Sequence, residues 1–293
     1  PRSTQGVSSA ASDVYKRQGL GRLINRFIGT LPILRKCCIR PYIVARPVTN
    51  KRKEDKSVSI IIPCKNEKGN IENAIKRIPK FGKDIEIIYV EGGSKDGTFA
   101  EINRVIQEYP KLNIKGIKQS KKGKANAVWE GFAKASGEIL MILDADLTTP
   151  PEALPKFYDA IINNHGEFIN GSRLVYPLED QSMRFLNYIA NRSFSYIFTW
   201  LLNQRFTDTL CGTKVLLKSH YKKIADNRSY FGDFDPFGDF DLIFGASKAN
   251  LKCVEIPVRY AARAYGETQI SRFKHGWLLL KMVAFAYKKL KAM

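Results

Sequence analysis

Two aspartates separated by one residue, Asp144 and Asp146, directly follow the apolar run of residues 138–143. On an extended chain such a pair projects to the same side, so the two carboxylates repel each other unless a cation lies between them. Their hard oxygen atoms suit Mg²⁺ or Mn²⁺ better than Zn²⁺, and an ion held there would neutralise a bound diphosphate. The alternatives are a solvated acidic loop, or an aspartate that caps the next helix.

Two other polar segments also follow apolar runs: "PCKNE" at residues 63–67 and "EGGSKDGT" at residues 91–98. In the second segment Ser94 and Asp96 can cap a helix, and Gly97 frees the backbone close to a ligand. A plain turn between a strand and a helix is the alternative for this segment. Because three such segments occur in sequence, we favour the metal-site interpretation of the two aspartates.

The segment "KKGKANA", residues 121–127, places three lysines at an expected helix start. Backbone N–H groups at such a start also favour anions; the alternative is a solvated basic face. A P-loop is excluded, because it requires Gly where Lys118 stands and Ser or Thr where Ala125 stands. No G-x-G-x-x-G follows a predicted strand either, which argues against a dinucleotide site.

Strands that alternate with helices must position these segments. The alternation predicts an α/β fold with a mostly parallel sheet, and continuous apolar strands fit burial on both faces. Ligands bind beyond the carboxyl ends of such strands, where all three polar segments lie. We expect strands at residues 58–64, 86–90, 114–119, 138–143, 167–174, 209–217 and 252–260, and helices at 70–78, 98–109, 124–135, 152–163, 183–202, 240–248 and 277–290.

The charge of the chain points to an anionic partner. It carries 48 Lys and Arg against 28 Asp and Glu, a net charge of +20, which suits nucleic acid, an anionic membrane surface or a phosphorylated substrate. The excess lies mainly in residues 1–57 and 270–293. We expect no nucleic-acid partner, because acidic strand ends without a bound metal repel phosphates.

The ends of the chain set the domain boundaries. Residues 1–18 contain "VSSAASDVYKRQ", similar to a translated sequencing adapter, and we treat them as non-native. Residues 19–57 are a basic amphipathic segment and linker, or the tail of a missing upstream domain. The chain begins at Pro1, so we expect a fragment. Five cysteines without paired spacing favour a reducing compartment, and no apolar run is long enough to predict a transmembrane helix.

The motifs "SIIIPCKNE", "EGGSKDGT", "MILDADLTTPP" and "NGSRL", in this order, resemble family 2 glycosyltransferases with the GT-A fold. "VEIPVRYAARAYGET", residues 254–268, is similar to polyprenyl-phosphate hexosyltransferases of the dolichyl-phosphate mannose synthase type. The resemblance covers residues 58–290. It predicts a GT-A domain at residues 58–274 and a C-terminal amphipathic helix at residues 275–293.

The resemblance also implies roles for individual residues. Asp144 and Asp146 are the pair that binds Mg²⁺ or Mn²⁺, and Asp239 or Asp241 is the acidic residue near the acceptor. "QISRF" is similar to a signature of processive members, which adds Gln269 and Arg272 to the acceptor side. Nucleotide-sugar binding is expected from Pro63, Asn66, Glu67, Glu91, Ser94, Asp96, Lys124, Asp144, Arg173 and Arg263, with Arg263 also facing the acceptor.

The expected reaction is metal-dependent transfer of a hexose, with inversion, from a UDP- or GDP-sugar. The expected acceptor is a polyprenyl phosphate on the inner face of the cell membrane, where basic apolar segments at residues 185–206 and 275–293 would lie in the interface. The alternatives are a glycan hydroxyl acceptor with Asp241 as base, a nucleotidyltransferase, or a non-catalytic scaffold. Glu91-Gly92 departs from the two acids that usually precede Gly-Ser in the family, which leaves the nucleobase open.

Overall fold

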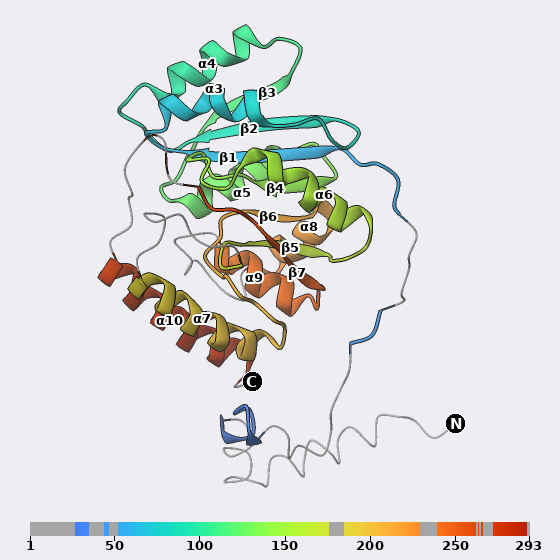
Figure 1. Ribbon diagram of the computed structural model, residues 1–293, viewed down its shortest axis with the longest axis vertical. Coiled ribbons are helices and arrows are strands. Elements are labelled where there is room, and N and C mark those ends of the chain that lie inside the picture. The colour runs from blue at the N-terminus through green and yellow to red at the C-terminus, as the bar shows by residue number, and fades with distance from the viewer. Residues whose placement is uncertain are drawn as a thin grey trace.

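The computed structural model describes residues 27–34, 44–46, 52–175, 185–228, 239–261, 263, 265 and 272–291, with backbone alone for residues 185–190, 239 and 272–276. Its centre is a seven-stranded sheet with the order β3-β2-β1-β4-β6-β5-β7, seen in Figure 1. The strands are β1 (Val58–Cys64), β2 (Ile85–Glu91), β3 (Asn113–Lys118), β4 (Ile139–Ile142), β5 (Phe168–Ser172), β6 (Lys214–Leu217) and β7 (Cys253–Pro257).

Helices connect the strands and cover both faces of the sheet. They are α3 (Lys68–Arg77), α4 (Thr98–Glu108), α5 (Lys124–Lys134), α6 (Leu154–Ile162), α7 (Phe185–Leu202), α8 (Lys218–Asp226), α9 (Asp239–Lys248) and α10 (Arg272–Leu290). A 3-10 turn, η3 (Pro151–Ala153), precedes α6. The alternation predicted between residues 58 and 163 is confirmed, with element ends that differ by a few residues.

The sheet is mostly parallel, as predicted. β1 pairs in parallel with both β2 and β4, with Val58 opposite Ile85 on one side and Ile139 on the other. β6 is the exception, because it runs antiparallel to its two neighbours, β4 and β5. The parallel strands β1, β2 and β4 therefore end at one edge of the sheet, and their following loops meet there.

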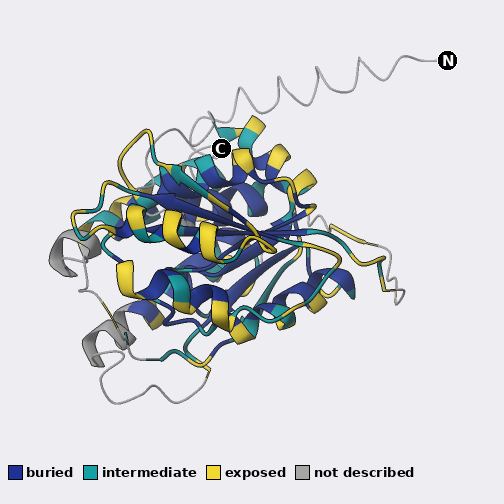
Figure 2. Ribbon diagram, turned by 90° about the horizontal axis from the view of Figure 1, so that it is seen from above, coloured by how far each residue is buried: buried dark blue, intermediate teal, exposed yellow. Residues whose placement is uncertain are grey.

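Apolar side chains from both faces of the sheet form two buried clusters. Ile60 and Ile62 lie in one cluster and Ile61 lies in the other, because successive strand residues point to opposite faces. Figure 2 shows the buried strands between two layers of helices. Gly131 brings α5 close to the sheet, since a Cβ there would lie 2.5 Å from Ile61 Cγ2. The continuous apolar strands thus bury both faces, as their composition predicts.

The structure of the second half of the chain differs from the sequence prediction in two places. The strand expected at residues 209–217 is limited to β6, because the preceding residues run past the carboxyl end of β4 and hold Gly212 against Asp144. The sequence analysis also missed α8. Its buried residues, Tyr221 and Ile224, are only three apart and its other positions are mostly polar, so the apolar periodicity was too short to detect.

Helices α7 and α10 lie side by side below the sheet (Figure 1). Residues 27–34 contact both helices: Trp200 Nε1 donates to the carbonyl of Thr30 at 2.9 Å, and the Tyr287 hydroxyl donates to the carbonyl of Phe27 at 2.9 Å. Trp200 also stacks on Tyr287, with ring centroids 5.6 Å apart. Among the described helices, none is both long enough and apolar enough to cross a membrane.

At the amino-terminal edge of the sheet, Glu86 is buried with 3% of its surface exposed. One carboxylate oxygen accepts hydrogen bonds from the Ser59 hydroxyl and from the Ser136 N–H, the latter at 2.8 Å. The other oxygen lies 2.5 Å from Lys115 Nζ. Burial alone would raise the pKa of Glu86, but these donors outweigh it and lower the pKa to about 2. The carboxylate therefore stays ionised and fastens three strands together.

Candidate active site

Asp144 lies just beyond β4, in a loop held by the hydrogen bond from Leu143 N to the Ile61 carbonyl at 3.0 Å. Its carboxylate is 2.6 Å from Lys124 Nζ at the start of α5, and 24% of its side chain is exposed. Gly212 lies behind it, where any Cβ would clash with the carboxylate. Burial would raise the pKa of Asp144, but Lys124, Lys214 and Arg173 outweigh it and hold the pKa below its ordinary value.

Asp146 has partners on both carboxylate oxygens. Oδ1 accepts the N–H of Thr148 at 3.1 Å and its hydroxyl at 2.8 Å. Oδ2 lies 2.6 Å from Arg263 Nη2, and the same guanidinium lies 3.3 Å from Glu67 Oε1. Asp146 thus caps a local turn through one oxygen and presents the other oxygen to a cation; it does not cap the next helical element, η3, whose N-cap residue is Pro150.

The loops after β1 and β2 are joined by side-chain hydrogen bonds. Asn66 N donates to Ser94 Oγ at 2.9 Å, and Lys95 N donates to Asn66 Oδ1 at 2.9 Å. Asp96 accepts the N–H of Lys68 at 3.1 Å and of Thr98 at 3.0 Å, which are the first residues of α3 and α4. Asn66 adopts a φ of 54° to make these contacts. Three predicted nucleotide-binding residues, Asn66, Ser94 and Asp96, therefore shape one rigid double loop.

Glu67 and Glu91 belong to the same double loop. Glu67 Oε2 accepts a hydrogen bond from Asn70 Nδ2 at 2.7 Å, and its backbone N–H donates to the Thr98 hydroxyl at 3.1 Å. Burial raises the pKa of Glu67, while Asn70 and Arg263 oppose that shift. Glu91 is 5% exposed and accepts the N–H of Ser94. Pro63, also predicted to bind nucleotide, lies within β1 opposite Val90.

Arg173 lies beyond β5 and forms a two-pronged ion pair with Asp208, at 2.6 and 2.8 Å. Its side chain is 12% exposed and that of Asp208 is fully buried. Asp208 also accepts the Arg173 N–H at 3.0 Å and the Leu210 N–H at 3.0 Å. The guanidinium, which the resemblance places at the phosphates, has its fork directed at this carboxylate, while Tyr260 lies under it at 5.1 Å.

Asp241 lies in the first turn of α9 and is 5% exposed. Its carboxylate lies 3.1 Å from Arg228 Nε. The same guanidinium lies over the Trp129 ring at 4.1 Å and donates to the Tyr221 hydroxyl at 3.2 Å. The backbone of Asp239 begins α9 and that of Arg272 begins α10. The side chains of Asp239 and Arg272, and the whole of Gln269, lie outside the described residues.

Two residues near the aspartate pair escaped the sequence analysis. Lys214 begins β6, is fully buried, and donates to the Cys211 carbonyl. Its charge helps to lower the pKa of Asp144. Asp208 is the buried partner of Arg173. In the sequence, Lys214 is a charged residue at the start of a short apolar run, "KVLL". This pattern does not show which groups surround the charge in the folded chain.

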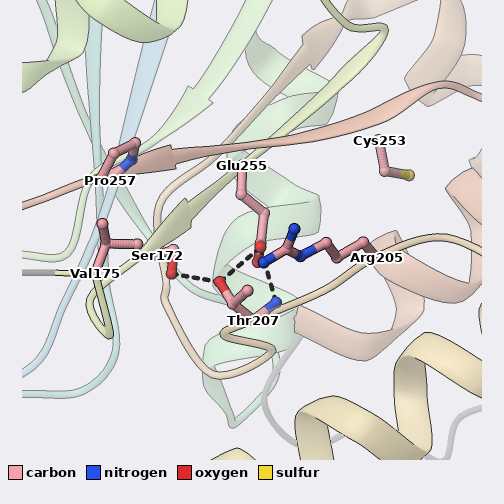
Figure 3. Close-up of a pocket in the computed structure, with 7 residues that line it drawn as sticks. All are labelled: Ser172, Val175, Arg205, Thr207, Cys253, Glu255 and Pro257. Atoms are coloured by element: carbon pink, nitrogen blue, oxygen red, sulfur yellow. Dashed lines mark hydrogen bonds between the residues drawn. The ribbon is translucent and has the colours of Figure 1, made fainter.

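A hollow of about 350 Å³ lies elsewhere, at the β5–β7 edge. Figure 3 shows Glu255 at its centre, accepting the N–H and the hydroxyl of Thr207 at 2.8 and 2.7 Å. The other carboxylate oxygen accepts hydrogen bonds from Asp208 N and Asn170 Nδ2. Because Glu255 is the single carboxylate among the described residues that line it, this hollow is a weaker candidate for catalysis than the site that brings Asp144, Asp146 and Glu67 together.

The aspartate pair fits a hard divalent cation. Carboxylate oxygens from Asp144 and Asp146 already attract Lys124 and Arg263, so the place draws positive charge. Among the described residues no three His, Cys, Asp or Glu side chains gather as a complete metal cage. Mg²⁺ characteristically binds through one or two carboxylates and completes its shell with substrate phosphates and water. The donor set therefore suits an ion that arrives with a diphosphate.

The fold and the comparisons define the class of protein. The sheet with its flanking helices is a GT-A fold: glucosyl-3-phosphoglycerate synthase of Mycobacterium tuberculosis, solved with Mn²⁺, UDP and glucosyl-3-phosphoglycerate, matches with a TM-score of 0.58, at 15% identity and over 80% of each chain. Residues 59–224 match the family described as Glycosyl transferase family 2. The chain belongs to this family.

Two curated relatives share about 30% sequence identity with this chain. Dolichol-phosphate mannosyltransferase of Pyrococcus furiosus is 30% identical over 73% of this chain and 59% of its own length. The UDP-N-acetylglucosamine--dolichyl-phosphate N-acetylglucosaminyltransferase of Methanococcus voltae is 30% identical over 78% of this chain and 97% of its own. The chain thus spans about three fifths of the Pyrococcus relative, and the resemblance to polyprenyl-phosphate sugar transferases is confirmed.

Proposed function

We propose that this protein transfers a hexose from a UDP- or GDP-sugar to a polyprenyl phosphate, with inversion, on the inner face of the cell membrane. The observation that carries the proposal is the group of charges beyond β1 and β4. Glu67, Asp144 and Asp146 supply carboxylates, and Lys124 and Arg263 supply cations. Two of the curated relatives carry names that specify a dolichol or dolichyl phosphate.

The donor would bind with its diphosphate at this group of charges. A divalent ion held by Asp144 and Asp146 would supply positive charge to the leaving diphosphate. Lys124 and Arg263 would add charge-assisted hydrogen bonds to the phosphate oxygens. Gly212 leaves room for the Asp144 carboxylate, and the Thr148 contacts fix the orientation of Asp146. These groups would therefore stabilise the charge that develops on the leaving diphosphate as the sugar bond breaks.

A phosphate acceptor needs little help from a base. The second pKa of a phosphate monoester is about 6, so its attacking oxygen is already ionised at neutral pH. Asp241 is consistent with this view, because Arg228 and Tyr221 surround it and it is nearly buried. A glycan hydroxyl acceptor would instead require a carboxylate that accepts a proton, and Asp241 held by a guanidinium is a poor base.

The outer face of α10 supports contact with a membrane. Trp277 is 63% exposed and Leu280 is 49% exposed, and Lys281 and Lys288 lie on the same stripe at helical spacing. Exposed Phe27, Ile28, Leu31, Ile33 and Leu34 lie in the segment that contacts α10 through Tyr287. Apolar side chains beside lysines suit the interface of an anionic bilayer.

Transfer of radiolabel to an organic phase tests the proposal. The protein is incubated with Mn²⁺, undecaprenyl phosphate in detergent, and labelled UDP- and GDP-sugars in turn. We expect one donor to label the lipid, and Asp146→Asn to lower the labelling rate by about 10³-fold. Asp159→Asn is the matched control, because Asp159 is an exposed aspartate on α6. Metal-dependent donor hydrolysis without a lipid product would contradict the lipid acceptor and favour a hydroxyl.

Vesicle sedimentation tests the membrane contact separately. We expect the protein to sediment with vesicles that contain anionic lipid and to stay in solution with neutral vesicles. Replacing the exposed Trp277 and Leu280 together by Ser should weaken binding by about tenfold or more, since each loses apolar surface worth about 1.5–3 kcal/mol when fully buried. Exposed Leu112, which directly precedes β3 and lies outside α7 and α10, is replaced by Ser as a control for loss of an exposed apolar side chain. Equal binding of all variants would contradict the role of α10.

A further inference from the structure

Arg263 makes two ion pairs at the centre of the site. Its Nη2 lies 2.6 Å from Asp146 Oδ2 and its Nη1 lies 3.3 Å from Glu67 Oε1. Its side chain is 26% exposed, so water reaches the pair. The guanidinium thus bridges the loop after β1 and the loop after β4, although 117 residues separate it from Asp146.

Ala261 and Tyr265, on either side of Arg263, also contact this part of the site. Ala261 N donates to the Thr148 carbonyl at 2.9 Å, which ties this segment to the turn that Asp146 caps. On the other side, the Tyr265 ring lies against Gly69 so closely that a Cβ there would come within 2.7 Å. Arg263 is therefore anchored at the aspartate pair by its neighbours, not only by its own charge.

The contact occupies the oxygen that a metal ion needs. Asp146 Oδ1 already accepts two hydrogen bonds from Thr148, so Oδ2 is the more available ligand atom. Arg263 Nη2 lies on that oxygen at 2.6 Å. A divalent ion that binds Asp146 Oδ2 must compete with the guanidinium. A diphosphate that arrives with the ion gives the guanidinium a new anionic partner, so the contact with Asp146 is replaced and not simply lost.

We propose that Arg263 is a built-in counter-ion that couples the binding of the divalent ion to the binding of the donor's diphosphate. This inference rests on the proposed function, because it concerns the same site. Arg263 lowers the affinity for the ion alone by competing for Asp146, and raises the affinity for the ion and diphosphate together. Such coupling is reciprocal, so each ligand strengthens the binding of the other by the same factor.

The charges of the site agree with this proposal. Glu67, Asp144 and Asp146 carry three negative charges, and Lys124, Arg263 and the buried Lys214 carry three positive charges. A divalent ion and a diphosphate with two negative charges add no net charge when they enter together. The ion alone would leave two uncompensated positive charges in the site, and the diphosphate alone would leave two uncompensated negative charges. The pair is therefore favoured over either ligand alone.

The test measures Mn²⁺ binding without any sugar transfer. Electron paramagnetic resonance distinguishes free from bound Mn²⁺ and gives the dissociation constant for the wild type and for Arg263→Gln. We expect the variant to bind Mn²⁺ alone about tenfold more tightly, within the usual range of coupling between sites. Arg259→Gln is the matched control, because it removes the same charge four residues earlier on the same segment. Unchanged or weaker Mn²⁺ binding by Arg263→Gln would overturn the proposal.

A second arm measures nucleotide binding by calorimetry, with UDP and GDP in turn and with Mn²⁺ present. We expect Arg263→Gln to bind the preferred nucleotide about tenfold more weakly, and Arg263→Lys to recover part of the loss. Tighter binding of Mn²⁺ alone together with weaker binding of the nucleotide supports the counter-ion role of Arg263. A variant that weakens both ligands would overturn it. If Arg263→Gln changes Mn²⁺ and nucleotide binding in opposite directions but the wild type does not label the lipid, the proposed acceptor is refuted and the counter-ion role is not.

Discussion

Carboxylates occur at both edges of the sheet, and they are held in different ways. At the amino-terminal edge Glu86 is 3% exposed and is fixed by a hydroxyl, a backbone N–H and Lys115. At the carboxyl edge Asp144 and Asp146 are held by Lys124 and Arg263, whose side chains are 33% and 26% exposed. Glu86 has two short donors fixed by the backbone in addition to Lys115, whose side chain is 47% exposed, whereas Asp144 and Oδ2 of Asp146 pair with long, partly hydrated cations.

This difference separates stability from binding. Donors on the backbone and on Ser59 cannot leave Glu86 without breaking the sheet, so that carboxylate acts as a permanent fastening. Lys124 and Arg263 can move to another anion at small cost, because their heads already contact water. We therefore expect substitutions at the amino-terminal edge to change unfolding, and substitutions at the carboxyl edge to change ligand binding and rate.

The largest expected effect is on catalysis. Asp146→Asn should lower the rate of lipid labelling by about 10³-fold, since it removes charge at the leaving diphosphate. The melting temperature should change little, because Asn keeps an oxygen that can accept the Thr148 hydrogen bonds. Labelling rates and thermal melts of both proteins check this. Strong labelling by the variant would place the chemistry elsewhere.

Glu86→Ala should have the opposite profile. It leaves the buried Ser59 hydroxyl and the part-buried Ser136 N–H without their acceptor, which should lower the free energy of unfolding by about 3 kcal/mol. Below its melting temperature the variant should keep the labelling rate of the wild type. Urea unfolding measures the first quantity. If Glu86→Ala keeps its stability but labels the lipid more slowly, the proposed difference between a stabilising edge and a ligand-binding edge is wrong.

Substitution of Arg173 tests whether this residue stabilises the fold, as Glu86 does, or binds the donor, as Arg263 is proposed to do. Arg173→Lys removes the two-pronged contact with fully buried Asp208, and should lower the free energy of unfolding by about 2 kcal/mol. We expect the KM for the donor to change little, because the guanidinium fork is directed at Asp208. The measurement is urea unfolding beside steady-state kinetics. A raised KM with unchanged stability would instead support the phosphate-binding role that the family resemblance implies.

The smallest expected effect is a change with pH at Glu86. Its folded pKa of about 2 lies below the ordinary value of 4.5, so its contribution to stability is present above pH 4.5 and is lost as the pH falls toward 2. The difference in unfolding free energy between wild type and Glu86→Gln should therefore shrink as the pH falls from 5 to 3. A difference that stays constant across this range would contradict the assigned cause.

Much of the fold was predictable because its signals are local. Strands β1, β2 and β4 are short, mostly apolar runs, and the helices between residues 58 and 142 show apolar residues at helical spacing. The second half was less predictable. The antiparallel direction of β6 depends on which neighbours it meets, and the loop before it is buried by contact with Asp144 and not by its own pattern.

The sequence by itself determined that two aspartates follow a buried strand and that "PCKNE" and "EGGSKDGT" follow two others. Since parallel strands end at one edge of a sheet, the predicted fold already placed these segments together. The sequence also identified Lys124, at a predicted helix start, and Arg263, in a family motif, as candidates for binding the nucleotide-sugar.

Only the tertiary structure decided which charges meet. Lys124 pairs with Asp144, Arg263 bridges Asp146 and Glu67, and Arg173 turns to Asp208. The positions of these groups depend on the packing of segments 20, 117 and 35 residues apart in the chain. Residue types report which groups carry charge. The energy of a charge depends on its distance from other charges and on its burial, and both are fixed only when the chain has folded.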